Sequence, residues 1–264
     1  MNTAPLGVFD SGIGGLTVAR ALFERLPNEA VIYFGDTARV PYGPKSPETV
    51  RRYSGEILSF LLGRGVKAVV VACNTSTAHA LTSLKEKSPV PVVGVIEPGA
   101  RAAVAATRTG NIGVIGTAGT IASGAYERAI KALRPDAHVH GQPCPLFVPL
   151  VEEGWFEHPA AELIAREYLE PLRRAKVDVL VLGCTHYPLL KPLLVRVMGP
   201  GVTLVDSAEE TATAVARELE RLDLLANGGA HDHRFVVSDD EPHFRKVGAL
   251  FLREKLKLIE VVPL

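Results

Sequence analysis

Cysteine is scarce in this chain, and the pattern of its three cysteines excludes two common uses of the residue. Three cysteines in 264 residues are too few for a disulfide framework. No two of them are spaced as C-x-x-C, so the usual zinc and redox motifs are missing as well. We therefore expect reduced thiols and no metal site.

The chain also lacks net charge and long apolar runs. Lys plus Arg and Asp plus Glu number 29 each, so no net charge attracts nucleic acid or an anionic membrane. No uninterrupted apolar stretch reaches the length that a bilayer requires, and the first residues lack the basic and apolar regions of a signal peptide. We expect a soluble, cytoplasmic protein that has neither nucleic acid nor a membrane as a partner.

What the sequence does contain is a regular alternation of aliphatic runs with amphipathic helical stretches. The aliphatic runs predict strands at 5–9, 30–34, 67–72, 90–95, 111–115, 137–140, 177–182 and 202–205. The stretches between them predict helices at 15–26, 47–65, 78–87, 118–133, 159–175 and 209–225. This alternation predicts an α/β fold with parallel sheets covered by helices and functional residues at the carboxyl ends of the strands.

Matching motifs recur in the same order in two parts of the chain. GVFDSG at 7–12 resembles GVIGTA at 113–118, and the two lie 66 and 71 residues before Cys73 and Cys184. The segments 93–97 and 203–207 form a third pair, after the cysteines.

The repeat predicts two pseudo-symmetric parallel-sheet domains that face a central cleft. We place the first domain at 1–97 plus the tail 208–264, and the second at 98–207. The tail, expected to add a helix and a strand, is too short to bury a core alone and should pack back on the first domain. Chance similarity among strand-loop-helix units is the alternative.

Cys73 and Cys184 occupy matched settings. Each follows an aliphatic run and precedes residues that can cap a helix, so each thiol is expected to be half exposed at the carboxyl end of a strand. Amides and the dipole of a helix N-terminus favour a thiolate there. A small core residue is the alternative for either cysteine alone, but the matched pair favours function. Cys144, between two prolines, has no counterpart and is interpreted as structural.

Two thiols on opposite sides of a cleft suit one class of reaction. A base on one face of a stereocentre and an acid on the other can remove and return a proton, which is racemisation or epimerisation. A thiolate can act as the base when its pKa is pulled below the free value of roughly 8.5. Near-attack contact from both sides of one carbon would place the sulfurs roughly 7 Å apart. Amides that hold the carboxylates of the substrate would stabilise the developing charge, so no metal is required.

The glycine-rich turn DSGIGG at 10–15 follows a strand and opens a helix. Its amides and the Ser11 hydroxyl could hold an anion of carboxylate size, and a helix N-cap is the alternative role of Asp10. The turn is not a G-x-G-x-x-G motif, and Asp36 is only a weak candidate for the acidic partner of a nucleotide. Nucleotide binding is therefore disfavoured.

Further polar residues are expected at the same cleft. Tyr42 and Gly43 lie in a turn that would bring backbone amides into the cleft. The alternative is a rigid loop with a packed tyrosine. His186 adjoins Cys184 and could polarise its thiol or exchange a proton with it, whereas a structural histidine is the alternative. Glu152 either points into the cleft or is solvated. Short polar residues that follow strand ends either line the cleft or cap helices: Asn74, Thr75, Thr117, Thr120 and Thr185.

Six motifs in this order resemble glutamate racemases, of the cofactor-independent aspartate/glutamate racemase superfamily. They are DSGIGG at 10–15, PYG at 41–43, ACNT at 72–75, GTAGT at 116–120, CPLFVPLVE at 144–152 and GCTHYP at 183–188. The resemblance runs from about residue 6 to about residue 210. It implies interconversion of L- and D-glutamate without a cofactor, with Cys73 and Cys184 as the acid/base pair. Three further residues would assist the thiols or lie near the ammonium group: Asp10, Glu152 and His186.

The resemblance also implies a glutamate-binding site and a biological role. The implied binding residues match family positions: Asp10, Ser11, Tyr42, Gly43, Asn74, Thr75, Thr117, Thr120, Thr185 and His186. The implied role is the supply of D-glutamate for peptidoglycan, by a homodimer in the bacterial cytoplasm. Three alternatives remain open: a racemase for aspartate or another amino acid, a two-lobed binding protein for an acidic ligand, and a Rossmann-type nucleotide binder.

Overall fold

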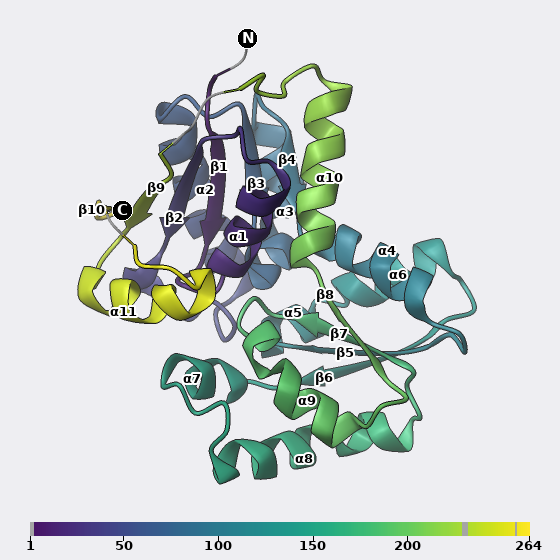
Figure 1. Ribbon diagram of the computed structural model, residues 1–264. Helices are drawn as coiled ribbons and strands as arrows, with labels where there is room; N and C mark the ends of the chain where they lie inside the picture. The colour runs from purple at the N-terminus through teal and green to yellow at the C-terminus, as the bar shows by residue number, and fades with distance from the viewer. Residues whose placement is uncertain (1–2, 229–231, 257) are drawn as a thin grey trace.

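The computed structural model describes residues 3–228, 232–256 and 258–264, and it contains two β-sheets, one above the other in Figure 1. The first sheet has the strand order β10-β9-β2-β1-β3-β4, and the second has the order β6-β5-β7-β8. All the neighbouring strands are parallel, which confirms the predicted α/β class. The strands are β1 (Leu6–Asp10), β2 (Val31–Gly35), β3 (Ala68–Val71), β4 (Val92–Gly94), β5 (Asn111–Gly116), β6 (His138–Pro143), β7 (Val179–Gly183), β8 (Thr203–Asp206), β9 (Arg234–Val237) and β10 (Ile259–Val261).

Helices cover both faces of each sheet. They are α1 (Leu16–Arg25), α2 (Pro47–Gly63), α3 (Asn74–Lys87), α4 (Ile96–Ala106), α5 (Ala118–Ala122), α6 (Ala125–Leu133), α7 (Phe147–Glu152), α8 (Pro159–Arg174), α9 (Lys191–Met198), α10 (Ala208–Arg221) and α11 (Glu241–Leu252). Two short 3-10 turns, η1 (Thr37–Arg39) and η2 (Tyr187–Leu190), follow strand ends. No described helix is both long enough and apolar enough to cross a membrane.

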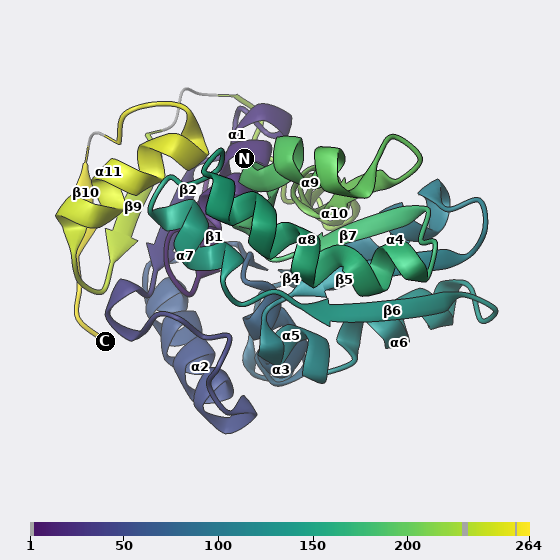
Figure 2. The same ribbon diagram turned by 90° about the horizontal axis from the view of Figure 1, so that it is seen from below.

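Strand β7 shows why the aliphatic runs are continuous. Leu180 and Leu182 belong to the core that α8 and α9 cover, whereas Val179 and Val181 belong to the core shared with α4 and α6. Figure 2 shows α9 and α6 on opposite sides of this sheet. A parallel strand that is buried on both faces needs apolar residues at every position. The first sheet is built in the same way, with α1 and α10 on one face and α2 and α3 on the other.

The strand order is the same in the two halves of the chain. The order β2-β1-β3-β4 in the first sheet corresponds to β6-β5-β7-β8 in the second, so β1 and β5 hold equivalent places, as do β3 and β7. The repeated motifs lie at these strands, which gives the repeat a structural basis. The division of the domains near residues 97 and 207 stays a prediction.

The C-terminal tail packs back on the first sheet, as expected, but it adds more than a helix and a strand. It contributes α10, β9, α11 and β10, and β9 pairs with β2 from Ile32↔Arg234 to Gly35↔Val237. The two added strands have four and three residues. Each contains a charged residue, Arg234 in β9 and Glu260 in β10, so neither is a continuous aliphatic run.

Several helices differ from the sequence-based expectation. The stretch 118–133, expected as one helix, is split into α5 and α6 at Gly124, whose φ of +64° ends regular α-helix. Helix α3 begins at Asn74, four residues before the expected start, so it opens directly after Cys73. Helices α4, α7 and α9 were not predicted, and each contains a proline within its first turns, which obscures the helical pattern.

Candidate active site

The carboxyl ends of the two sheets face one another, and their loops are in direct contact. The hydroxyl of Thr75, after β3, lies 2.9 Å from the hydroxyl of Thr117, after β5. The phenol of Tyr126 donates to Asn74 Oδ1 at 2.7 Å. Because β1 and β3 belong to one sheet and β5 and β7 to the other, the strand ends that carry the expected site residues converge on one region.

Cys73 is the N-cap of α3, and its side chain is 5% exposed rather than half exposed. Its Sγ accepts the amide of Ser76 at 3.4 Å and lies 3.7 Å from the hydroxyl of Ser11. Burial raises the pKa of Cys73 to about 11, and the carboxylate of Asp10 acts in the same direction. The expected thiolate is therefore wrong for Cys73, because the cost of desolvation exceeds the effect of the helix N-terminus.

Cys184 follows β7 and is also buried, with 6% of its surface exposed, so its expected half exposure is wrong too. Its Sγ lies 3.9 Å from His186 Nδ1, and His186 Nε2 lies 2.8 Å from Glu152 Oε1. Three residues that the sequence analysis singled out thus form a continuous chain of contacts.

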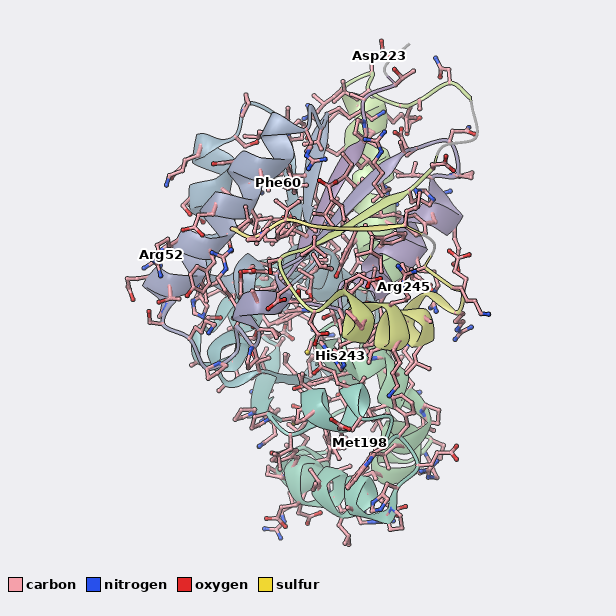
Figure 3. The ribbon with its side chains drawn as sticks, turned by 90° about the vertical axis from the view of Figure 1, so that its left-hand side faces the viewer. Arg52, Phe60, Met198, Asp223, His243 and Arg245 are labelled. Atoms are coloured by element: carbon pink, nitrogen blue, oxygen red, sulfur yellow. The ribbon has the colours of Figure 1, made fainter. Side chains whose placement is uncertain are left out.

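The pKa of His186 is raised in this chain of contacts. Burial lowers its pKa, but hydrogen bonds to Cys184 and Glu152 outweigh this effect and raise the pKa to about 10. Burial raises the pKa of Glu152, but the hydrogen bond from His186 reverses the shift, and the net pKa lies below its ordinary value. His243 of α11, at the boundary of the two halves in Figure 3, adds to the lowering. An imidazolium therefore lies between a carboxylate and the sulfur of Cys184.

Asp10 lies at the end of β1 and is fully buried. Its Oδ2 accepts the amide of Gly12 at 3.0 Å, while no described residue makes a hydrogen bond to its Oδ1. Burial raises its pKa, and the charge of His186 opposes the shift. The N-cap of α1 is Gly15, so Asp10 is not the helix cap that was its alternative role. Its carboxylate contributes to the raised pKa of Cys73, and His186 acts on the carboxylate in turn.

The glycine-rich turn after β1 packs against the loop after β7. A Cβ at Gly14 would overlap Thr185 Oγ1 and His186 Nδ1, so only glycine fits there. The hydroxyl of Thr17 donates to the carbonyl of Thr185 at 3.3 Å. These contacts bring the two halves of the chain together beside Cys184.

Hydroxyl groups from both halves cluster between the sheets. Thr120 Oγ1 lies 3.2 Å from Thr75 Oγ1 and 3.0 Å from Thr117 Oγ1. Thr117 also caps α5, which was its alternative role. Asn74 Nδ2 is buried and has no hydrogen-bond partner within the described part of the chain. This amide and these hydroxyls form a polar cluster between the sheets, and their role as the lining of a substrate cleft stays a prediction.

The ring of Tyr42 does not line the cleft. Its side chain is 1% exposed, and its phenol donates to the buried carboxylate of Asp36. The alternative role of a packed tyrosine therefore holds for the ring, whereas the neighbouring Gly43 lines the cavity beside the site. Nothing in the local sequence links Asp36 to Tyr42, so from the sequence Asp36 was only a weak candidate for a nucleotide contact.

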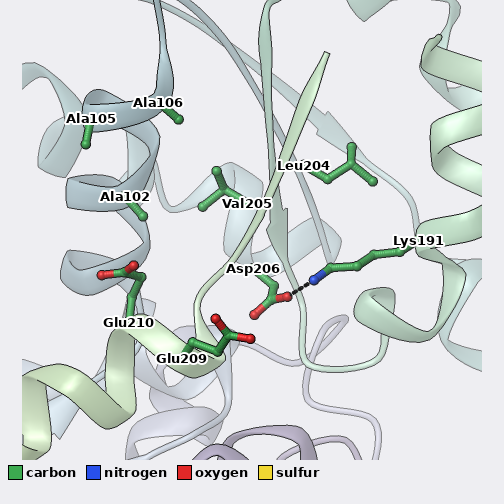
Figure 4. Close-up of a pocket in the computed structure, with 9 residues that line it drawn as sticks. All are labelled: Ala102, Ala105, Ala106, Lys191, Leu204, Val205, Asp206, Glu209 and Glu210. Atoms are coloured by element: carbon green, nitrogen blue, oxygen red, sulfur yellow. Dashed lines mark hydrogen bonds and ion pairs between the residues drawn. The ribbon is translucent and has the colours of Figure 1, made fainter. Parts of the chain in front are cut away.

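One cavity lies beside these residues, and another lies away from them. A cavity of about 420 Å³ is lined by the loop 40–44, by α7 and by three expected site residues, Gly43, Thr117 and Glu152. A second cavity, of about 400 Å³, lies between α4, β8 and α10, and contains the ion pair of Lys191 with Asp206 (Figure 4). No expected site residue lines this second cavity.

Cys144 is fully buried in the core that contains Phe147, and burial raises its pKa. Among the residues that the structure describes, no group of three or more His, Cys, Asp or Glu side chains could hold a metal ion.

Comparison with known proteins supports the resemblance seen in the motifs. The family model Asp/Glu/Hydantoin racemase matches residues 13–215. A glutamate racemase of Geobacter metallireducens is 57% identical over 252 residues, which cover 95% of this chain and 93% of the relative.

Two solved structures have nearly the same fold. The glutamate racemase of Francisella tularensis, solved in complex with D-glutamate, has a TM-score of 0.94 and 38% identity, with coverage of 99% of this chain and 98% of that one. The glutamate racemase of Thermus thermophilus, solved with beta-chloro-D-alanine, has a TM-score of 0.90 and 49% identity, with coverage of 100% and 98%. The chain therefore belongs to the Asp/Glu/hydantoin racemase family, within its group of glutamate racemases, and is an isomerase.

Proposed function

We propose that this protein interconverts L- and D-glutamate with Cys73 and Cys184 as the two acid/base groups. The observation that carries the proposal is the coupling of the two thiols through buried charges. Asp10 acts on Cys73, His186 acts on Asp10, and His186 contacts Cys184. Two sulfurs that belong to one electrostatic network and come from opposite halves suit proton transfer on two faces of a ligand.

A two-base reaction needs one protonated sulfur and one deprotonated sulfur at the start. With a pKa of about 11, Cys73 enters as the thiol at neutral pH. The imidazolium of His186, 3.9 Å from Cys184 Sγ, stabilises negative charge on that sulfur. Cys184 then removes the α-proton of one enantiomer, and Cys73 donates its own proton to the opposite face. The other enantiomer reacts by the reverse transfers, so each turnover exchanges the protonation states of the two sulfurs.

The buried groups without partners suit an amino acid. Asp10 Oδ1 offers a carboxylate oxygen for the ammonium group, and Asn74 Nδ2 offers a donor for a carboxylate. Further donors surround them: the side chains of Ser11, Thr75, Thr117, Thr120 and Thr185 and the backbone of residues 42 and 43. Donors fixed around the carboxylate stabilise the charge that develops when the α-proton leaves. No step in this scheme requires a cofactor.

The wider role follows from the resemblance to glutamate racemases. We propose that the product D-glutamate is used in bacterial peptidoglycan synthesis, in the cytoplasm, and that the protein acts as a homodimer. We also retain the division into a domain of residues 1–97 plus 208–264 and a domain of residues 98–207. Mass measurement in solution tests the dimer.

Hydrogen exchange in deuterated water tests the activity. The enzyme should replace the α-hydrogen of both glutamate enantiomers by deuterium and exchange aspartate much more slowly. Equal or faster exchange of aspartate would show a racemase of different specificity. Binding of glutamate without exchange would show a two-lobed binding protein. Saturable nucleotide binding in the absence of exchange would favour a nucleotide-binding protein.

A further inference from the structure

Asp36 is a buried carboxylate that the proposed reaction does not use. It follows β2, is fully buried, and accepts three side-chain hydrogen bonds. Its Oδ2 accepts from the phenol of Tyr42 and from Arg39 Nε at 2.7 Å, and its Oδ1 accepts from Ser238 Oγ at 2.8 Å. A buried carboxylate destabilises the fold unless hydrogen-bond donors surround it. Movement of Tyr42, Arg39 or Ser238 away from Asp36 is therefore unfavourable.

Tyr42 connects Asp36 to the loop 40–44. Besides its phenol bond to Asp36, its ring packs on Tyr53 with the centroids 5.7 Å apart. The side chain therefore anchors the loop in the first half of the chain. Gly43, the next residue, lines the cavity beside the site.

The same loop contacts the second half at Gly43. The carbonyl of Gly43 accepts the amide of Gly119 at 3.0 Å. A Cβ at Gly43 would lie 2.8 Å from Thr117 Cβ, so the loop and the N-terminus of α5 are in close contact. A small displacement of the loop would therefore change the polar lining on both sides of the cleft.

The C-terminal tail supports Asp36 from the opposite side. Ser238 follows β9, and its Oγ accepts the amide of Ala38 at 2.9 Å while it donates to Asp36. The amide of Ser238 donates to the carbonyl of Gly35 at 3.1 Å. The tail contains no expected site residue, yet it completes the hydrogen bonds that fix the loop.

We propose that Asp36 is a positioning residue for substrate binding, which it serves by holding Tyr42 and the loop 40–44 with the support of Ser238. The proposal rests on the proposed function, since it assigns the backbone of residues 42 and 43 to the bound glutamate. These backbone groups bind the substrate before and during proton transfer alike. Loss of Asp36 therefore weakens binding more than it slows the chemical step.

Steady-state kinetics with a matched control test the proposal. Asp36→Ala should raise KM for both glutamate enantiomers at least tenfold and change kcat less than threefold. Asp36→Asn keeps an acceptor oxygen in the same place and should bring KM back to within threefold of the wild type.

The control is Asp178→Ala. Asp178, directly before the amino end of β7, is a buried carboxylate that accepts from Thr107 at 2.6 Å and from two backbone amides. Its loss should lower Tm but leave KM within twofold.

A double variant tests the route through Tyr42. Because Asp36 acts through the phenol, Asp36→Ala combined with Tyr42→Phe should raise KM no more than Asp36→Ala alone. Additive effects would overturn this route. An unchanged KM in folded Asp36→Ala, or an equal rise in Asp178→Ala, would overturn the positioning role.

Ser238→Ala decides the question if Asp36→Ala does not fold. A rise in KM of at least threefold supports the role, and a wild-type KM overturns it. Failure of the wild-type protein to exchange the α-hydrogen of glutamate would overturn the proposed function instead, so the two failures are distinguishable.

Discussion

The two candidate acid/base residues have different surroundings although their local sequences match. Cys73 is surrounded by the amide of Ser76, the hydroxyl of Ser11 and the carboxylate of Asp10, and its pKa is raised. Cys184 lies beside the imidazolium of His186. The two sulfurs therefore have different neighbours, a carboxylate near Cys73 and an imidazole beside Cys184.

Replacement of either sulfur tests the pair. Cys73→Ala and Cys184→Ala should each abolish racemisation of both enantiomers and leave the fold intact, because each direction needs both an acid and a base. The rate of change in optical rotation measures this, and near-native activity in either variant would reject the two-base mechanism. Cys144→Ala is the control, and it should retain activity because Cys144 lies in the core.

The raised pKa of His186 predicts how stability depends on pH. The folded pKa of about 10 exceeds the ordinary value of 6.5, so the stabilisation is fully present below about pH 6.5 and is lost as pH rises through about 10. Relative to His186→Gln, the wild-type free energy of unfolding should fall across this window, by at most about 1.4 kcal/mol per pH unit. Urea unfolding at several pH values measures the difference. If the free energy of unfolding changed with pH in the same way in both proteins, the raised pKa of His186 would be contradicted.

At the scale of elements, strand ends and the turns after them build the site. The turn after β1 has to approach the loop after β7 closely, and glycine permits that approach at Gly14. The loop after β2 is fixed by Asp36, and helix α3 begins at Asn74 directly after the first thiol. The sheets supply the rigid positions, and the loops supply the chemistry.

Gly14→Ala tests the close approach of the two halves. The added methyl group would overlap Thr185 and His186, so it should displace the histidine and reduce kcat/KM at least tenfold. The matched control is Gly55→Ala in α2, where nothing lies within 4 Å of an added Cβ. That change should stabilise the protein by about 0.5–1 kcal/mol and leave activity unchanged. Wild-type activity in Gly14→Ala would show that the contact is not needed.

At the scale of the whole molecule, segments distant in sequence hold the first sheet together. Lys67 Nζ lies 2.6 Å from Glu29 Oε2, and both side chains are almost fully buried. Lys67 also donates to the carbonyl of Leu224 at 2.7 Å, and Glu29 accepts the amide of Ala226 at 2.8 Å. This pair fixes the chain after α10, where the tail returns to the first sheet.

Removal of one partner of this pair should be costly. Glu29→Gln leaves the ammonium of Lys67 buried without its counter-charge and should lower the free energy of unfolding by about 3–5 kcal/mol. Glu97→Gln, which breaks the exposed pair with Arg101, is the control and should change it by less than about 1 kcal/mol. Chemical denaturation measures both. Equal effects in the two variants would show that burial of the pair is unimportant.

The local sequence was sufficient for the α/β class, most strands and the placement of Cys73 and Cys184 after β3 and β7. These features depend on residues close together in the chain: aliphatic runs form strands, and helix-capping residues mark the turns. The motif order was likewise sufficient for the family. The split at Gly124 and helix α4 were missed, because short helices that contain glycine or proline give weak patterns.

Tertiary structure decided the burial of both thiols, the raised pKa of His186 and the hydrogen bonds of Tyr42 and Ser238 to Asp36. Each depends on contacts between segments far apart in sequence, as in the hydrogen bond from Ser238 to Asp36 across 202 positions. Desolvation and hydrogen bonding depend on which groups fill the surrounding space. Strand-end position is a property of the local chain, whereas the protonation state of a buried group belongs to the folded molecule.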